Sequence, residues 1–358
     1  MDDGGRRRRV LRRVFLVVVL GTTLLAVTGV VVARAVTGGP ILESLQTIDL
    51  KWLAAATLCV VLGTASHGPR MRPLMPPPGP GGQVPGVATL GSLYVAASVL
   101  NLSFPGPAGE IAAALVLGRT HKLRPTAVLA ASLHARFVAL LVAAVITLVA
   151  LPFLTIPPEV RPIAWVGAGA LGAGGLVLGL LSFRPARFRA LSETINGGLS
   201  RALPSPLSRF FAALHRQVLQ FSEALVAVPR QGPGAYISAA VWSFGSLCLS
   251  FTAIMSAAAA FGLSPGWLGT FVTLCLTLIA AIALVVLPGG LGTFDLTLVG
   301  MLVASAGLTA AEAGLVLLGV RCAQILGVAV ATIAFLSWAG QLLRADVVAR
   351  VEGGGLEE

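Results

Sequence analysis

Four charged side chains lie inside strongly apolar sequence, in two matching pairs. Glu110 follows a Pro/Gly-rich stretch, and Arg136 comes 26 residues later. Asp295 follows a second such stretch, and Arg321 again comes 26 residues later. Charge is costly at membrane depth and is usually retained there for function. The carboxylates could accept protons or hydrogen bonds, and each guanidinium could bind a phosphate through paired N–H donors.

The stretches before the two acids predict breaks between helices. Freed backbone N–H groups and short-helix N-termini at such breaks attract anions. The predicted helix-break residues are Pro105, Gly109, Pro288, Gly289, Gly290 and Gly292. The predicted substrate-binding residues are Glu110, Arg136, Asp295, Arg321, Asn101 and Thr293. A structural role for the acid–arginine pairs remains the alternative, since buried pairs can fix helix register. Which acid pairs with which arginine stays open.

Composition identifies the class of protein that carries these residues. The chain is 56% hydrophobic and 11% charged, and its mean hydropathy is +0.91. These values predict an all-α polytopic membrane protein and exclude an ordinary soluble domain. The net charge of +11 comes from arginines at the edges of apolar segments. That placement indicates the positive-inside rule and anionic lipid partners, with no nucleic acid.

Cysteine and histidine spacing predicts neither a metal site nor a cofactor. The four cysteines lie in separate apolar stretches, and the four histidines have no metal-ligand spacing. His134, two residues before Arg136, is interpreted mainly as a helix contact. We therefore expect no catalytic residues, no metal and no cofactor.

Apolar runs predict about six full spans within one integral membrane domain, residues 1–340. The tail, residues 341–358, and both termini are expected in the cytoplasm, with the protein in the plasma (inner) membrane. The expected spans are about 10–35, 50–67, 125–152, 161–182, 234–262 and 309–339.

Two shorter apolar regions contain the breaks. Within about 87–118 and 266–306, the pieces on each side of the break are mostly too short to cross an apolar core of about 30 Å. We expect two re-entrant helical hairpins that enter from opposite sides, which is the arrangement of an inverted repeat. A topology in which every segment spans is the alternative.

Two polar regions complete the predicted topology. Arg70 and Arg72 are assigned to a cytoplasmic loop after the second span. Residues 183–232 carry apolar side chains at helical spacing between arginines, which predicts an amphipathic cytoplasmic helix. It lies either on the membrane surface or packed beneath the bundle as a connector.

At these motifs the sequence resembles a known family. Pro105-Gly-Pro-Ala-Gly-Glu110 is similar to the P-x-x-x-G-E motif of the transmembrane region of lysylphosphatidylglycerol synthases, and Pro288-Gly-Gly-Leu-Gly292 to its P-G-G-L-G motif. The resemblance covers about residues 10–340 and implies a flippase-like protein. The chain departs from the pattern at Ala113, at Ala135 and at Asp295, where the family often has Arg, an acid and Glu. These differences bear on a lysyl lipid substrate more than on the fold.

The resemblance implies a lipid flippase or transporter for an anionic, aminoacylated or polyprenyl-linked lipid. Family members that also synthesise the lipid carry a separate aminoacyltransferase domain. Because little sequence follows residue 340, we expect no enzymatic activity here. The alternative is a non-transporting membrane partner or regulator of a lipid synthase or glycosyltransferase. An enzyme acting on lipid is disfavoured because each half carries only one acid at its break.

Overall fold

A computed structural model describes the helical parts of the chain. The described residues are 48–75, 77–78, 82–103, 108–154, 232–283 and 293–353, with a few isolated positions between 158 and 172. These residues are helical or in short connections, which confirms the all-α prediction. The first predicted span, most of the span at 161–182, and the amphipathic segment at 183–232 lie outside the described residues.

Four helical segments are long and apolar enough to cross a membrane, and each matches a predicted span. They are Leu50–Leu74, Pro125–Phe153, Pro233–Ala259 and Ala310–Ala331. The second contains α7 (Pro125–Ala150) and the 3₁₀ turn η2 (Leu151–Phe153), and the third is α11 (Pro233–Ala259). The fourth belongs to α14 (Ala310–Gly353), which continues well past the predicted end at residue 339.

The first of these segments corrects the predicted loop around Arg70. It consists of α3 (Leu50–Ala65), α4 (His67–Met71) and the 3₁₀ turn η1 (Arg72–Leu74). Ser66 keeps a right-handed helical conformation and its N–H still bonds to the Leu62 carbonyl, so the chain stays helical. The loop prediction was wrong, because Arg70 lies in α4 and Arg72 begins η1. Gly68 and Pro69 both lie inside α4, so the helical segment continues through them.

The helix α4 packs against α5 (Val87–Ser103). A Cβ atom at Gly68 would lie 2.5 Å from the Gly91 nitrogen, and one at Gly91 would lie 3.0 Å from the Ala65 carbonyl oxygen. Only glycine permits so close a crossing. The two glycines thereby place α4, with its polar side chains, directly against the first short helix.

Each predicted hairpin consists of two short helices that contact each other. In the first half of the structure, α5 contacts α6 (Ala108–His121); in the second half, α12 (Trp267–Ala283) contacts α13 (Thr293–Ala306). Glu110 and Asp295 are the third residues of α6 and α13. Arg136 and Arg321 are the twelfth residues of α7 and α14. The charges therefore occupy equivalent positions in matching elements.

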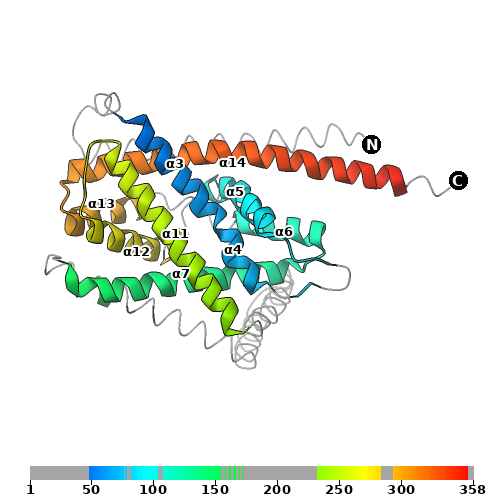
Figure 1. Cartoon of the computed structure of the whole chain (residues 1–358), viewed down its shortest axis with the longest axis horizontal. Coiled ribbons are helices and arrows are strands. Elements are labelled where there is room, and N and C mark those ends of the chain that lie inside the picture. The colour runs from blue at the N-terminus through cyan, green and yellow to red at the C-terminus, as the bar shows by residue number, and fades with distance from the viewer. Residues whose placement is uncertain are drawn as a thin grey trace, which may run out of the picture.

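The contacts between the two halves also occur in matching pairs. The short helix α5 contacts α14 of the other half, just as α12 contacts α7. Likewise α3 contacts α14 while α11 contacts α7, and α3 contacts α11. Figure 1 shows α7 and α14 running in opposite directions, with α5 and α6 toward one end of the bundle and α12 and α13 toward the other. Four described elements of one half thus have counterparts in the other.

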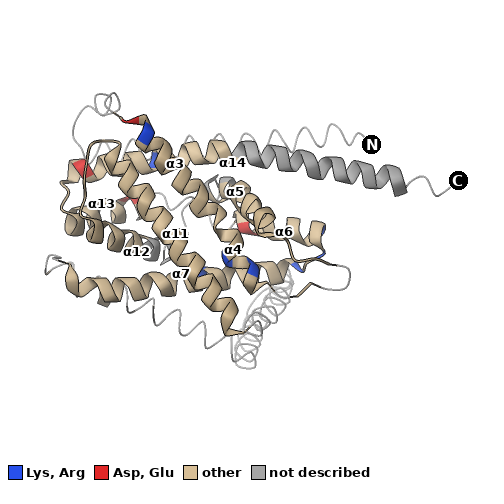
Figure 2. Ribbon diagram, viewed as in Figure 1, with Lys and Arg blue, Asp and Glu red and all other residues tan. Residues whose placement is uncertain are grey.

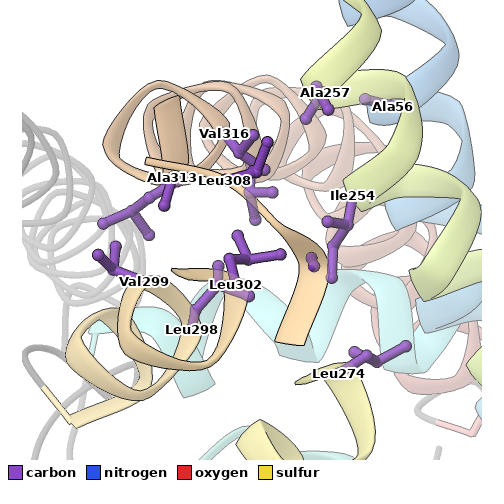
Figure 3. Packing of buried hydrophobic residues seen from close by; sticks show 14 of the residues in the cluster. Ala56, Ile254, Ala257, Leu274, Leu298, Val299, Leu302, Leu308, Ala313 and Val316 are labelled. Carbon is purple, nitrogen blue, oxygen red and sulfur yellow. The ribbon is translucent and has the colours of Figure 1, made fainter. Parts of the chain in front are cut away.

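Apolar packing holds each half together. One core cluster joins α5, α6 and α7, and another joins α11, α12, α13 and α14, where Leu298 and Leu302 face Ile254 and Leu308 (Figure 3). Large apolar side chains also cover the outside of the long helices, where hydrocarbon rather than water suits them. Examples are Leu58, Leu62, Leu141, Val145, Ile237, Val241, Leu326 and Val330. Charged residues are sparse on the described bundle (Figure 2).

Candidate functional site

A cavity of about 380 Å³ lies where the two halves meet, and we call it the charged cavity. Its described wall comes from α3, α4, α5, α6 and α7 of the first half and from α14 of the second. Apolar atoms make up most of the exposed wall area. Its polar and titratable lining residues are Thr64, His67, Arg70, Tyr94, Ser98, Asn101, Glu110, Arg136 and Gln324.

Glu110 forms the acidic part of this wall. It is 6% exposed, and its Oε1 accepts a hydrogen bond from the Arg136 guanidinium in an ion pair. Its Oε2 accepts a hydrogen bond of 2.9 Å from the Ser132 hydroxyl. Ser132 and Arg136 are four residues apart on α7, so both face the start of α6. The carboxylate therefore keeps partners on both oxygens although little water reaches it.

Arg136 is the accessible member of the pair. Its side chain is 34% exposed, against 8% for that of Glu110, and it lines the charged cavity. A guanidinium has five N–H donors, and one carboxylate oxygen uses few of them. Arg136 can therefore bind a second anionic group in the cavity while it stays paired with Glu110.

Asn101 and Gly109 close the gap between α5 and α6. The Gly109 N–H, at the start of α6, donates a hydrogen bond of 2.7 Å to Asn101 Oδ1. A Cβ atom at Gly109 would lie 2.1 Å from the Ala97 carbonyl oxygen, so the helices can approach only with glycine there. Asn101 thus satisfies one of the free N–H groups of the short helix and also lines the cavity.

The second pair lies inside protein instead of on the cavity wall. Arg321 Nε donates a hydrogen bond of 2.8 Å to Asp295 Oδ1, and Arg321 is 2% exposed while Asp295 is fully buried. Arg321 also donates to Gln324 Oε1 at 2.8 Å, and its guanidinium lies 5.2 Å from the centre of the Phe294 ring. Each arginine thus pairs with the acid of its own half, which answers the question the sequence left open.

Gln324 links the second pair to the cavity. It lies three residues after Arg321 on α14, accepts its hydrogen bond, and contributes to the cavity wall. The polar path therefore runs from Asp295 through Arg321 to Gln324, and across the cavity to Arg136 and Glu110. The two halves meet at this site, but only the first half presents its ion pair directly.

Some predicted site residues fall outside what the structure describes. Thr293 begins α13, and its side chain is among the undescribed parts. The break residues Pro105, Pro288, Gly289, Gly290 and Gly292 also lie outside the described residues. Their role at the breaks stays a prediction.

Sequence reasoning missed three titratable residues of the cavity, which are Tyr94 and the neighbouring pair His67 and Arg70. His67 and Arg70 are three residues apart on α4, and an Arg70 guanidinium nitrogen contacts His67 Nδ1. The His67 ring also lies 4.3 Å from the Tyr94 ring, centre to centre. A helical spacing of three between His and Arg, just after an apolar span, was the signal available. Gly68 and Pro69 lie between these two residues, and a Gly-Pro pair is more typical of a turn than of a helix.

His134 takes no part in the cavity wall that the structure describes. It is 4% exposed, and its Nδ1 lies 3.0 Å from the Ala130 carbonyl oxygen, to which it donates. Its ring also meets Tyr236 edge-on, with 6.2 Å between ring centres. This agrees with its interpretation as a helix contact.

Comparison with known proteins decides the family. Residues 14–332 match the family model described as the lysylphosphatidylglycerol synthase TM region. The chain belongs to this family. The match covers both hairpins and all four long helices, so the charged cavity lies within the transmembrane region that defines the family.

No curated protein and no solved structure shows a significant match to the chain. Within the lysylphosphatidylglycerol synthase TM-region family, two of the three departures noted in the sequence, Ala113 and Ala135, have packing explanations. Ala113 is 1% exposed and belongs to the apolar cluster of the first half, and Ala135 is fully buried there. At both positions this chain has a small apolar contact where a charge would need a partner.

Proposed function

We propose that the protein is a membrane lipid transporter that moves an anionic, aminoacylated or polyprenyl-linked lipid between leaflets. The observation that carries the proposal is the charged cavity at the contact of the two halves, within a bundle whose outer surface is apolar. A lipid likewise combines a polar part with an apolar part. Its polar head suits a cavity with an ion pair and amide groups, while its acyl or prenyl tails suit the hydrocarbon around the helices.

Two features support an inverted repeat with two re-entrant hairpins. The described α5, α6, α12 and α13 are each shorter than the four span-length helices, and the two pairs carry their acids at the same helical position. The opposite directions of α7 and α14 agree with halves of opposite orientation (Figure 1). In such a repeat, rocking of one half against the other exposes a shared site to each leaflet in turn.

The proposed cycle needs no covalent chemistry and no cofactor. Arg136 binds the anionic part of the headgroup, and Glu110 holds Arg136 in place and compensates its charge when the cavity is empty. The plasma membrane, with both termini in the cytoplasm, is the proposed location because arginines flank the apolar segments.

The test is lipid translocation in proteoliposomes made with the purified full chain. Fluorescent phosphatidylglycerol, lysyl-phosphatidylglycerol and a polyprenyl phosphate serve as probes, with and without a proton gradient. We expect translocation of at least one probe above protein-free vesicles. Glu110→Gln and Arg136→Gln should lower its rate about tenfold or more, because each removes a charge-assisted hydrogen bond at the headgroup site.

Arg119→Gln is the matched control, because Arg119 is exposed at the far end of α6 and outside the described cavity wall. Its rate should equal that of the unmodified chain. If folded protein moves no probe under any gradient, the transport proposal fails. Co-purification of a lipid synthase or glycosyltransferase would then favour the partner or regulator function.

A further inference from the structure

Arg70 is the charged group of the cavity that has no carboxylate partner among the described residues. Glu110 pairs with Arg136, and Asp295 pairs with Arg321. Among the described residues, the Arg70 side chain has its hydrogen-bond contact with the neighbouring His67, and it interacts electrostatically with Arg136, Glu110 and Tyr94. The described cavity wall thus contains two arginines against one carboxylate.

The contact between Arg70 and His67 also determines the state of the histidine. Arginine is only a donor, so His67 Nδ1 must be the acceptor. A neutral imidazole with an accepting Nδ1 carries its proton on Nε2. With Nδ1 as acceptor, Nε2 is the ring nitrogen left to carry a proton and donate.

Both residues are left with an unused donor. Arg70 Nε and His67 Nε2 are buried and have no hydrogen-bond partner within the described part of the chain. A buried donor without an acceptor costs free energy, and a buried cation without an anion costs more. What Arg70 and His67 lack is therefore an anion rich in acceptor oxygens.

We propose that Arg70 and His67 form the phosphate-binding site of the charged cavity, and that the preferred substrate is a phosphate-bearing lipid whose headgroup lacks a positive charge. The inference rests on the proposed function and narrows its substrate class. A phosphate has several acceptor oxygens and negative charge, so it can accept from the guanidinium of Arg70 on the cavity wall, and from the buried N–H of His67 once that ring turns toward the cavity. Arg136, held by Glu110, then lies beside the same headgroup.

The same charge balance disfavours aminoacylated headgroups. A lysyl or alanyl ester adds an ammonium group to the headgroup, and the described cavity wall offers it one carboxylate, Glu110, which is already paired with Arg136. Two arginines would repel the ammonium group at close range. The cavity is therefore built for an anionic headgroup such as a phosphodiester or phosphomonoester.

The test measures binding directly, without transport. The purified full chain in detergent is titrated with short-chain phosphatidylglycerol, with its lysyl ester, and with a short-chain glucosyl diacylglycerol that has no phosphate. We expect phosphatidylglycerol to bind tightest. Arg70→Gln should weaken its binding by about 10- to 100-fold and leave the glucosyl lipid unchanged. Arg70→Lys should retain part of the affinity, because it keeps the charge but loses the fork.

Two comparisons make the test specific. Arg72→Gln is the matched control, because Arg72 is exposed two positions away and outside the charged cavity. Thermal unfolding of each variant shows whether it is folded, and Arg70→Lys provides the comparison if Arg70→Gln is not. Inorganic phosphate is added as a competitor. If it displaces phosphatidylglycerol at a concentration equal to that of the lipid, the site binds free phosphate as well as it binds the lipid, and the assignment of a lipid ligand is overturned.

The outcomes separate this inference from the proposed function. Unchanged phosphatidylglycerol affinity in folded Arg70→Gln, or lysyl ester binding as tight as phosphatidylglycerol, overturns the assignment of Arg70 even if the protein transports lipid. Binding that depends on Arg70 supports the assignment even if the same preparation moves no lipid in vesicles, and in that case only the transport proposal fails.

Discussion

At the scale of residues, the two acid–arginine pairs are alike in sequence and different in environment. The Arg136 side chain is 34% exposed, whereas the Arg321 side chain is 2% exposed and has Asp295, Gln324 and Phe294 around it. A buried pair must be complete, because removing one partner leaves an uncompensated charge. The first pair can exchange partners with a ligand at less cost. We infer that the halves divide their tasks, with binding in the first and structural stability in the second.

This division predicts different responses to the loss of each acid. Asp295→Ala leaves Arg321 buried without its anion and should lower the free energy of unfolding by about 3–5 kcal/mol. Glu110→Ala should lower it by clearly less, because Arg136 can be solvated from the cavity. Unfolding of the purified variants by denaturant in detergent micelles checks the difference. Equal losses would mean that both pairs are structural.

At the scale of elements, the hairpins depend on close backbone contact. Gly109 lies against Ala97 in the first hairpin, and a Cβ atom at Gly269 would lie 1.8 Å from the Ser305 carbonyl oxygen in the second. Ser305 further bonds to the Thr273 hydroxyl at 2.9 Å, which ties α13 to α12. Gly109 precedes Glu110 directly, so the first close approach determines where the acid at the start of α6 lies. The second joins the start of α12 to the end of α13.

Alanine at the first contact should therefore displace α6. Gly109→Ala would place a methyl group against the Ala97 carbonyl, and Ala97 cannot move without α5. We expect a lower thermal midpoint and loss of lipid binding, because Glu110 is the residue after Gly109. Thermal unfolding and the phosphatidylglycerol titration measure both effects.

Gly300→Ala is the matched control for this prediction. Gly300 is a glycine of α13 with nothing within 4 Å of its added Cβ atom, so alanine there should be neutral or raise stability by up to about 1 kcal/mol. If Gly109→Ala behaves like Gly300→Ala, the close contact does not position α6.

At the scale of the whole molecule, the cavity lies between halves that transport would have to move. Its wall joins α3, α4, α5, α6 and α7 to α14, and the contacts between the halves repeat in pairs. Alternating exposure requires these contacts to change, whereas contacts inside a hairpin can stay intact. The two kinds of contact can therefore be tested separately by crosslinking.

A crosslink between the halves should stop transport reversibly. A Cβ atom at Gly327 of α14 would lie 3.4 Å from Val60 Cγ1 of α3, so Val60→Cys with Gly327→Cys suits a disulfide between them. The four native cysteines are first replaced by alanine. We expect oxidation to abolish lipid translocation in proteoliposomes and reduction to restore it.

The control crosslink lies inside the second hairpin. Thr273→Cys with Ser305→Cys joins α12 to α13 at a contact of 2.9 Å and should leave translocation unchanged when oxidised. Inhibition by both crosslinks would show that the hairpin itself must rearrange. Inhibition by neither would contradict motion between the halves.

The sequence by itself determined the elements and their spacing. Apolar run lengths predicted about six spans, four of which lie in the described residues and are confirmed there as long helices. They also predicted the short pairs, because a helix that crosses hydrocarbon must be long and continuous, and Pro/Gly breaks interrupt it. The equal spacing of acid and arginine predicted equivalent positions in both halves, since rise per residue is constant in a helix. The family resemblance carried by the Glu110 motif was confirmed.

Only the tertiary structure decided which charges meet and which of them face the cavity. Glu110 with Arg136 and Glu110 with Arg321 are equally compatible with the sequence, because pairing depends on contacts between distant helices. Arg70 entered the cavity for the same reason. Its position follows from the close approach of α4 and α5 at Gly68 and Gly91, and the spacing of residues along the chain does not predict that contact. The two ion pairs also differ in burial, which the sequence could not predict because the exposure of a side chain depends on what packs around it.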